Sequence, residues 1–186
     1  MIDDIDGYYL LSLGFENAHI TNPEAVLRQL RSSSEGVQVQ LLKAERIAGL
    51  EHLRFAARNA LLSFNGKNPR SKSLAVEYLL YISCQRQISK AIDFVGVEPS
   101  DHKVALVGLS ESKEQLSDLE GISGPLLGTA NSRVIEADFG QKLSALRKFY
   151  RISDREMNAA RFEGEADSEV VKRLIVERSA LLRIPD

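Results

Sequence analysis

The chain has 186 residues, 44% of them apolar and 27% charged, and its formal net charge is -2. This is ordinary globular composition at the length of one domain, so we expect a single domain spanning residues 1–186. The nearly neutral charge excludes a global attraction to nucleic acid, and any basic binding surface must be local. The sole cysteine, Cys84, excludes an intrachain disulfide and favours a reducing cytoplasm.

The N-terminal segment, MIDDIDGYYLL, is acidic where a secretory signal would be basic. No apolar run approaches the length that spans a bilayer. The sequence therefore predicts an intracellular, cytoplasmic protein without a membrane partner.

The first half of the chain alternates between strand and helix patterns. Asn22 and Pro23 form a helix-start signal, and a glycine- and proline-containing break at 66–69 separates two longer apolar patterns. Gly96 follows the last of them as an expected helix C-cap. In chain order the patterns predict a strand at 8–13, a helix from Pro23 to about Arg31, a strand at 37–41, and helices at 49–65, 71–83 and 88–95.

The second half is mostly helical. Residues 103–109 form a nearly continuous apolar run, which predicts a strand buried on both faces. A short helix at 112–119, a glycine-rich loop at 121–130 and one more strand at 134–137 are expected to follow. Helices are then predicted at 140–150, 153–162 and 168–182, and Ser153 with Glu156 fits a capping box. Together the elements predict an α/β (α+β) fold in which a small mixed sheet packs against several helices.

No catalytic, metal or cofactor pattern is present in the sequence. The three histidines lack metal-ligand spacing, and we expect His19 and His102 to lie exposed at element edges. Neither a GxSxG elbow nor a GxxxxGK[ST] phosphate loop occurs. Cys84 could act as a nucleophile if Arg86 lowered its pKa, but a lone cysteine at a helix end is more typical of packing. We therefore predict no catalytic residues, no metal and no cofactor.

A local excess of positive charge surrounds the predicted helix pair at 71–95. Between residues 67 and 90 the only acid is Glu77, and the preceding helix adds Arg54 and Arg58 four residues apart. Cations beside helix N-termini favour phosphate, although a charged face can also be merely solvated. Tyr78 and Tyr81 could stack on bases, but their apolar neighbours favour the core. The cations in this stretch are Lys67, Arg70, Lys72, Arg86 and Lys90.

A second basic cluster lies near the C-terminal helices. Its cations alternate with apolar residues, a pattern typical of a core-facing helix and also of a ridge that binds a partner protein. The cations are Lys142, Arg147, Lys148, Arg151 and Arg155, and the apolar residues include Leu143, Leu146, Phe149, Tyr150 and Ile152.

Residues 49–97, GLEHLRFAARNALLSFNGKNPRSKSLAVEYLLYISCQRQISKAIDFVGV, resemble the small non-enzymatic subunit of the KEOPS complex, the PRPK-binding protein family. The specific block is SLAVEYLLYIS at 73–83, followed by Arg86-Gln87-Ile88 and then Ala91-Ile92. The resemblance extends over roughly 37–152 and is looser toward its end. The intact Arg-Gln-Ile turn favours an archaeal-type member.

The resemblance implies a non-catalytic subunit that binds tRNA, notably its 3′ CCA end, and docks on the KEOPS protein kinase. Through the kinase it would join the KEOPS threonylcarbamoyl transferase subunit and support threonylcarbamoyladenosine formation in tRNA. A structural kinase-binding adaptor without RNA contact is the alternative. The predicted RNA-binding residues are Arg86, Gln87, Lys67, Arg70, Lys72 and Ser73, and the predicted kinase-binding residues are Leu143, Leu146, Phe149 and Tyr150.

Within the RNA-binding set, Arg86 and Gln87 match the family motif directly. The planar guanidinium of Arg86 suits a phosphate or base contact, and the Gln87 amide can pair with a base edge. Ile88 is expected to pack beneath the site. Lys67, Arg70 and Lys72 are predicted on charge alone.

Overall fold

The computed structural model describes residues 1–66, 69–136 and 139–184. Its strands are β1 (Ile2–Ile5), β2 (Tyr8–Phe15), β3 (Gln38–Lys43) and β4 (Val104–Ser110). Its helices are α1 (Pro23–Ser32), the 3-10 helix η1 (Ala44–Arg46), α2 (Leu50–Phe64), α3 (Leu74–Ser83), α4 (Ile88–Val95), α5 (Lys113–Leu127), α6 (Arg133–Glu136), α7 (Phe139–Phe149), α8 (Asp154–Ala160) and α9 (Asp167–Leu181). This composition confirms the α+β fold class.

The four strands form a sheet in the order β1-β2-β4-β3, and each neighbouring pair is antiparallel. The prediction of a mixed sheet is therefore wrong in strand direction. The reason is that β4 inserts between β2 and β3, which both run opposite to it. Every residue of β4 is buried, as its continuous apolar pattern predicted.

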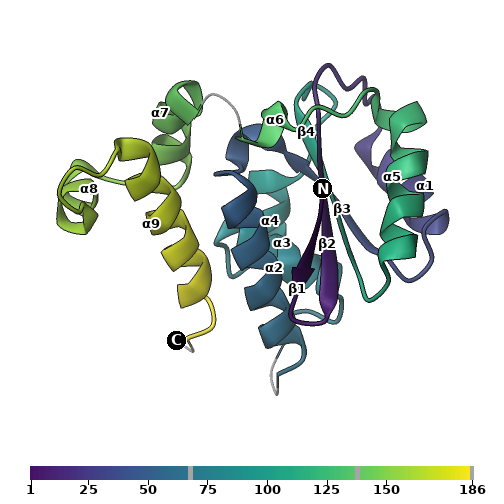
Figure 1. The fold of residues 1–186 in the computed structure, drawn as a ribbon, viewed down its shortest axis with the longest axis horizontal. Coiled ribbons are helices and arrows are strands. Elements are labelled where there is room, and N and C mark those ends of the chain that lie inside the picture. Colours follow the sequence, from purple (N-terminus) through teal and green to yellow (C-terminus); the bar gives the residue numbers. More distant parts are fainter. Residues whose placement is uncertain (67–68, 137–138, 185–186) are drawn as a thin grey trace.

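Helices cover both faces of the sheet (Figure 1). One face packs against α1 and α5, and the other packs against α2, α3 and α4. Helices α7, α8 and α9 lie beyond α2, on the side away from the sheet, and share a third apolar cluster. Over the described ranges, no helix combines the length and the apolar character needed to cross a lipid bilayer.

The predicted helix starts are confirmed by their caps. The Asn22 side chain accepts from the Ala25 N–H at 3.0 Å, with Pro23 in the first turn. Ser153 and Glu156 form the reciprocal capping box that begins α8. The helix predicted from residue 71 begins only at Leu74, because the segment before it is bound to a buried carboxylate described below.

Strand β2 confirms the strand predicted at 8–13, whereas β1 and the turn that joins it to β2 were not predicted from the sequence. The two-residue loop of this β1–β2 hairpin, Asp6-Gly7, has positive φ at both positions, 52° and 93°. That backbone is typical of the tight turns that match strand twist, and Asp-Gly is their common sequence.

Residues 121–127 continue helix α5, so the predicted glycine-rich loop is wrong over this range. Pro125 lies inside the helix, yet Leu116, Leu119 and Leu127 are buried along one side of it. Burial of this apolar face outweighs the weak helix propensity of the glycines and the proline. Propensity alone could not reveal this, because the partner surface on the sheet is distant in sequence.

The strand predicted at 134–137 is also wrong: residues 133–136 form α6, and residue 137 lies outside the described residues. β2 already pairs with β1 and β4, so no strand edge is available there. Val134 and Ile135 instead pack over the face of β2, where the Asn131 N–H donates to the Gly14 carbonyl at 2.7 Å.

Candidate functional site

A pocket of about 670 Å³ lies where the α3–α4 turn meets the C-terminal helices. We call it the turn pocket, and its volume falls in the range of ligand sites. Cations outnumber acids around it, and aromatic side chains contribute to its wall. Its charged lining residues are Arg86, Lys90, Arg151, Arg178 and Asp93, and its aromatic lining residues are Phe94, Phe149 and Tyr150.

The α3–α4 turn has a defined backbone geometry. Cys84, directly after α3, adopts a left-handed conformation with φ 53°. The Gln85 N–H donates to the Leu80 carbonyl at 3.1 Å, and the Cys84 N–H to the Tyr81 carbonyl at 3.3 Å. This is the Schellman pattern, which usually has glycine at the left-handed position. It reverses the chain sharply, so that α4 can start at Ile88 with Gln87 as its N-cap.

Both predicted RNA-binding arginines contact the chain segment after α9, Arg86 from the α3–α4 turn and Arg70 from the loop before α3. The exposed Arg86 donates from its two terminal nitrogens to the Ile184 carbonyl, at 3.3 and 3.2 Å. Arg70 donates to the Leu182 carbonyl at 2.8 Å. The structure therefore brings Arg86 and Arg70 to one segment, from residues far apart in sequence.

The rest of the predicted RNA-binding set is divided. Lys72 and Ser73 line a different hollow, of about 590 Å³, at the N-terminal end of α3. Helix α3 has ten residues, so its length of about 15 Å separates them from the turn pocket. Gln87 is exposed beside the turn pocket without lining it, and Lys67 lies outside the described residues.

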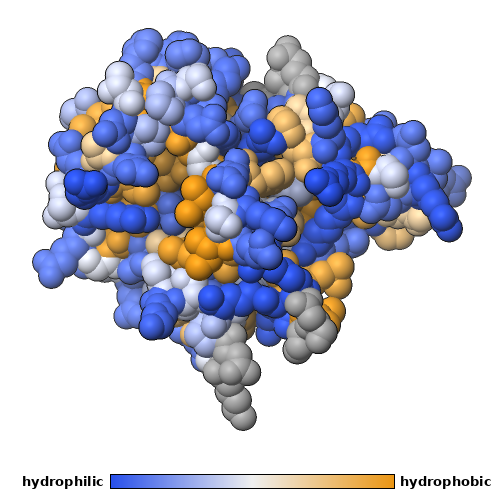
Figure 2. Space-filling view, turned by 180° about the vertical axis from the view of Figure 1, so that it is seen from behind, coloured by the Kyte–Doolittle hydropathy of each residue, from blue (hydrophilic) through white to orange (hydrophobic). Residues whose placement is uncertain are grey.

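Ile88 does not pack beneath the site as expected. Its side chain is 41% exposed, and Ile92, one helical turn on, is 52% exposed. The inward face of α4 is formed by Ala91 and Val95, which are fully buried. Figure 2 shows the back of the molecule, where apolar residues reach the surface near its centre between polar ones.

The acid inside the basic stretch, Glu77, is fully buried and shapes the α2–α3 loop. Its carboxylate accepts from the Ser63 hydroxyl at 2.7 Å and from the Ser71 N–H at 2.8 Å. A longer bond of 3.4 Å comes from the Arg70 N–H. Buried carboxylates need such donors, so Glu77 organises this loop and does not neutralise the surface.

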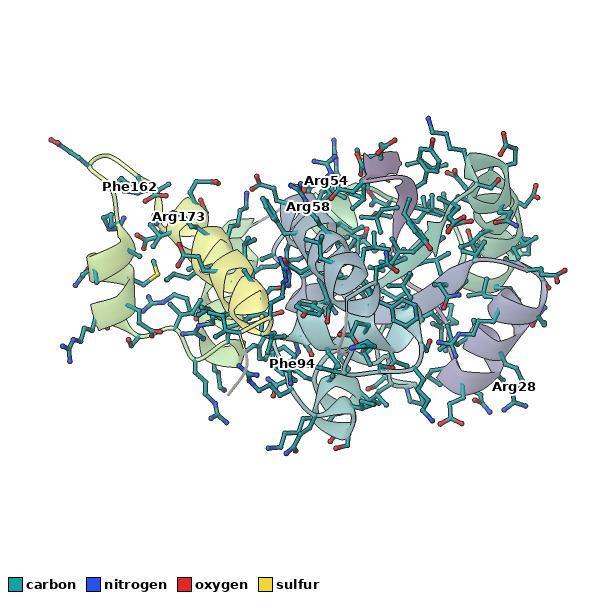
Figure 3. The ribbon with its side chains drawn as sticks, turned by 90° about the horizontal axis from the view of Figure 1, so that it is seen from below. Arg28, Arg54, Arg58, Phe94, Phe162 and Arg173 are labelled. Carbon is teal, nitrogen blue, oxygen red and sulfur yellow. The ribbon has the colours of Figure 1, made fainter. Side chains whose placement is uncertain are left out.

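The two arginines of α2 do not add to a basic surface. Arg54 pairs with Asp3 at 2.8 Å, and Arg58 pairs with Asp6 at 2.8 Å. Figure 3 shows both arginines on α2, on the side of the molecule that holds the β1–β2 hairpin. The acidic residues of the N-terminal segment therefore neutralise the positive charge of these two arginines.

The tyrosines of α3 belong to the core, as their neighbours indicated. Tyr78 and Tyr81 are 1% and 0% exposed, which removes them as stacking platforms. Burial raises the pKa of the Cys84 thiol to about 12, so the thiol stays protonated at neutral pH. This weighs against Cys84 as a nucleophile. Among the described residues, no three metal-binding side chains gather into a site.

The predicted kinase-binding ridge is largely interior. Leu146 and Tyr150 are 0% and 5% exposed, and both pack in the third apolar cluster. Leu143 and Phe149 are half-buried, and the Arg46 guanidinium lies 3.2 Å from the Phe149 ring centroid. The alternation of apolar and basic residues thus marks a core-facing helix here, and only Leu143 and Phe149 retain some surface.

Lys142, a member of the second basic cluster, is likewise turned inward. Its ammonium donates to the carbonyls of Ala44 and Val134, at 3.2 and 2.6 Å. Burial lowers the pKa of Lys142 to about 8. Lys142 therefore links α7 to η1 and α6 and is not a surface cation.

The structure is that of an α+β protein with a turn pocket that is basic and partly aromatic, which suits an anionic ligand. A family model described as kinase binding protein CGI-121 matches residues 17–183, and the chain belongs to this family. The match confirms the resemblance carried by the segment around Arg86. A search of the curated proteins found no match.

Proposed function

We propose that this protein is a non-catalytic accessory subunit of the KEOPS complex that binds tRNA through its 3′ CCA end and docks on the KEOPS kinase. In this role it supports threonylcarbamoyladenosine formation in the cytoplasm and joins the transferase subunit through the kinase. Family membership supports the kinase-binding part. The archaeal-type assignment stays a prediction.

The observation that carries the RNA-binding part is the composition of the turn pocket. An unpaired RNA end presents phosphates, ribose hydroxyls and unstacked bases. Arg86 and Lys90 supply positive charge for the phosphates, and Phe94 and Phe149 supply apolar ring surface for the bases. The first turn of α4 has no side-chain cap from Gln87, so its N–H groups can also face an anion.

Removal of Arg86 tests this role. Arg86→Ala should weaken tRNA binding about tenfold, because a charge-assisted hydrogen bond contributes about 1.5–3 kcal/mol. The salt dependence of binding should also flatten by about 0.7 in slope if Arg86 contacts a single-stranded phosphate. The measurement is a fluorescence-anisotropy titration at several salt concentrations, with tRNA that has or lacks its CCA end.

Arg28→Ala is a matched control, because Arg28 is an exposed arginine on α1, at the far end of the molecule from the C-terminal helices (Figure 3). It removes the same charge and should leave tRNA affinity unchanged. Equal affinity of the wild-type protein for the two forms of tRNA would contradict the CCA-end site.

The alternative, an adaptor that binds the kinase without RNA, is favoured by the family description alone. It predicts co-purification with the kinase and no mobility shift with tRNA even at low salt. Leu143→Glu tests the remaining part of the predicted docking ridge, and Phe55→Glu on the exposed side of α2 is its control. Unchanged co-purification of Leu143→Glu, in the absence of RNA, would remove this ridge from the interface.

A further inference from the structure

A second hollow adjoins the turn pocket along α7. It has a volume of about 480 Å³, and we call it the α7 groove. Arg151 lines both the turn pocket and this second hollow, so it lies at their boundary. The α7 groove is lined by Gly140, Leu143, Ser144, Arg147, Lys148, Arg151, Ile152 and Ser153.

Two cations of the α7 groove lack a partner within the part of the chain that the structure describes. Lys148 and Arg151 are both exposed, and neither side chain makes a hydrogen bond or ion pair there. Arg147, the third cation, pairs with Asp154 at 2.5 Å. Two uncompensated positive charges near each other favour binding of an anion.

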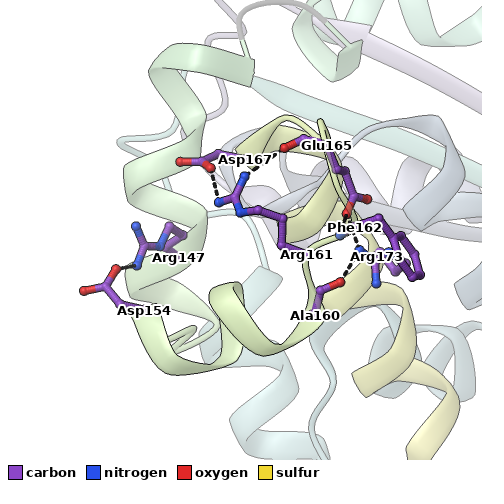
Figure 4. A network of polar contacts seen from close by, with 8 residues as sticks. All are labelled: Arg147, Asp154, Ala160, Arg161, Phe162, Glu165, Asp167 and Arg173. Carbon is purple, nitrogen blue, oxygen red and sulfur yellow. Dashed lines mark hydrogen bonds and ion pairs between the residues drawn. The ribbon is translucent and has the colours of Figure 1, made fainter.

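Two other arginines of the same C-terminal region are neutralised by carboxylates. Arg161 pairs with Asp167, and Arg173 pairs with Glu165 at 2.5 Å (Figure 4). On the opposite side of α2, Arg54 and Arg58 are paired as well. The α7 groove differs from these paired sites in that two cations of its lining keep their charge uncompensated within the described residues.

The backbone of Arg151 provides an independent observation. Its φ is 52°, a left-handed conformation that disfavours residues other than glycine. The Ile152 N–H donates to the Arg147 carbonyl at 2.8 Å, and the Arg151 N–H to the Lys148 carbonyl at 3.2 Å. This is again a Schellman ending, and glycine is the usual residue at its left-handed position. Strained residues of this kind gather at functional sites.

The composition of the α7 groove separates it from the turn pocket. Its lining contains no aromatic side chain among the described residues, so it offers no ring on which an unpaired base can stack. Phosphate contacts need only cations and donors, and they are made equally well to base-paired RNA. The groove therefore suits the backbone of a strand and does not suit its bases.

We propose that the α7 groove is a second RNA-binding site, which holds backbone phosphates of the base-paired stem that leads to the 3′ end. Lys148 and Arg151 contact these phosphates while the unpaired end occupies the turn pocket. This inference rests on the proposed function, since it assumes that RNA enters the turn pocket. It adds two residues that the sequence analysis placed only in a possible protein-binding ridge.

The test compares two RNAs that share a 3′ CCA end, a short single strand and an acceptor-stem hairpin. Wild-type protein should bind the hairpin more tightly and with a steeper salt dependence. Lys148→Ala should weaken hairpin binding several-fold and flatten its salt dependence by about 0.9 in slope, the value for one duplex phosphate. Binding of the single strand should not change, because Lys148 does not line the turn pocket. Arg28→Ala should change neither.

Arg151→Gly distinguishes a binding role from a structural one. Glycine relieves the left-handed backbone, so the melting temperature should rise, while hairpin binding should weaken several-fold. Arg151→Lys keeps the charge and the backbone strain, and it should retain most of the hairpin affinity. A purely structural Arg151 would leave RNA binding unchanged in both variants, and only Arg151→Gly would have a changed melting temperature.

The outcomes separate this inference from the proposed function. Wild-type binding that requires the CCA end, together with unchanged hairpin affinity in Lys148→Ala and Arg151→Gly, would overturn the α7 groove alone. Hairpin binding that ignores the CCA end but weakens in both variants would support the groove and contradict the CCA-end site. Absence of binding to either RNA would overturn both.

Discussion

Tyr150 was predicted to bind the kinase at the surface, but its side chain is buried and connects several helices. Its hydroxyl lies 2.8 Å from the Arg46 carbonyl and 3.1 Å from the Ile82 carbonyl. Its ring packs edge-to-face against His52 and Phe94, with ring centroids 5.9 and 5.2 Å away. Through these contacts one side chain joins α7 to η1, α2, α3 and α4.

Tyr150→Phe is expected to lower the free energy of unfolding by about 1–3 kcal/mol, because the carbonyls of Arg46 and Ile82 lose the single O–H donor that they share. Tyr9→Phe is a suitable control, since no hydrogen bond of the Tyr9 hydroxyl is found within the described residues. Urea denaturation of both variants measures the difference. Equal stabilities would mean that the Tyr150 hydroxyl contributes nothing to the connection.

His52 makes stability depend on pH. Its imidazole is fully buried, and Nδ1 accepts from the Ala48 N–H at 3.2 Å. Burial disfavours the imidazolium and lowers the pKa of His52 to about 3. The unfolded chain binds a proton at His52 below about pH 6.5, and the folded chain does not, so stability falls as the pH drops through this window.

Between pH 6.5 and pH 4.5, the wild-type protein should lose about 2 kcal/mol of unfolding free energy because of His52, at up to about 1.4 kcal/mol per pH unit. His52→Gln should lack this loss. His102→Gln, at an exposed position, should retain it. Urea titrations at several pH values test the difference between the two variants, and identical pH dependence in both would show that His52 is not the responsible group.

At the scale of elements, close approach of backbones decides where α6 lies. A Cβ atom at Gly14 of β2 would lie 2.7 Å from the Asn131 carbonyl oxygen and 2.8 Å from the Val134 Cβ. Neither atom belongs to the flexible end of a side chain. The absence of a side chain at Gly14 therefore allows the segment before α6, and α6 itself, to rest on the sheet.

Gly14→Ala should destabilise the protein by about 1–3 kcal/mol through overpacking. Gly121→Ala is its matched control. Gly121 lies in helix α5, and a Cβ atom added there would have no neighbouring atom within 4 Å. That control should raise stability by about 0.5–1 kcal/mol. The same sign for the two substitutions, measured by urea denaturation, would refute the packing explanation for Gly14.

At the scale of the whole molecule, the buried residues form three apolar clusters that are joined by packing contacts. Two of them lie on the faces of the sheet, and the third holds α7, α8 and α9. Helix α9 packs along α2, and Tyr150 reaches into the core beside α3. These contacts support the prediction that residues 1–186 form one domain.

If this prediction holds, thermal unfolding should follow one transition. Far-ultraviolet circular dichroism, which reports helices, and near-ultraviolet tyrosine signals should change together. Tyr150→Phe should shift both curves by the same amount, because it weakens the joint between the third cluster and the rest. Earlier melting of α7–α9, seen as an early loss of helical signal, would instead indicate two units.

Local signals explain what the sequence could predict. Asn22 with Pro23, and Ser153 with Glu156, use side chains within one helical turn, so their caps needed no knowledge of the fold. Helix α5 beyond residue 120 was missed because its apolar face depends on a sheet surface assembled from distant segments. The β1–β2 turn is a local signal of the same kind, because Asp6-Gly7 is a common sequence for a tight turn with positive φ at both residues.

The sequence by itself determined most helices, the central buried strand and the basic α3–α4 turn, because periodicity and caps act over a few residues. Only the tertiary structure decided which cations remain available to a ligand. Arg54 finds Asp3 across 51 residues, whereas Lys148 and Arg151 find no carboxylate within the described chain. Charge neutralisation depends on distances in space, and the order of residues along the chain does not contain those distances.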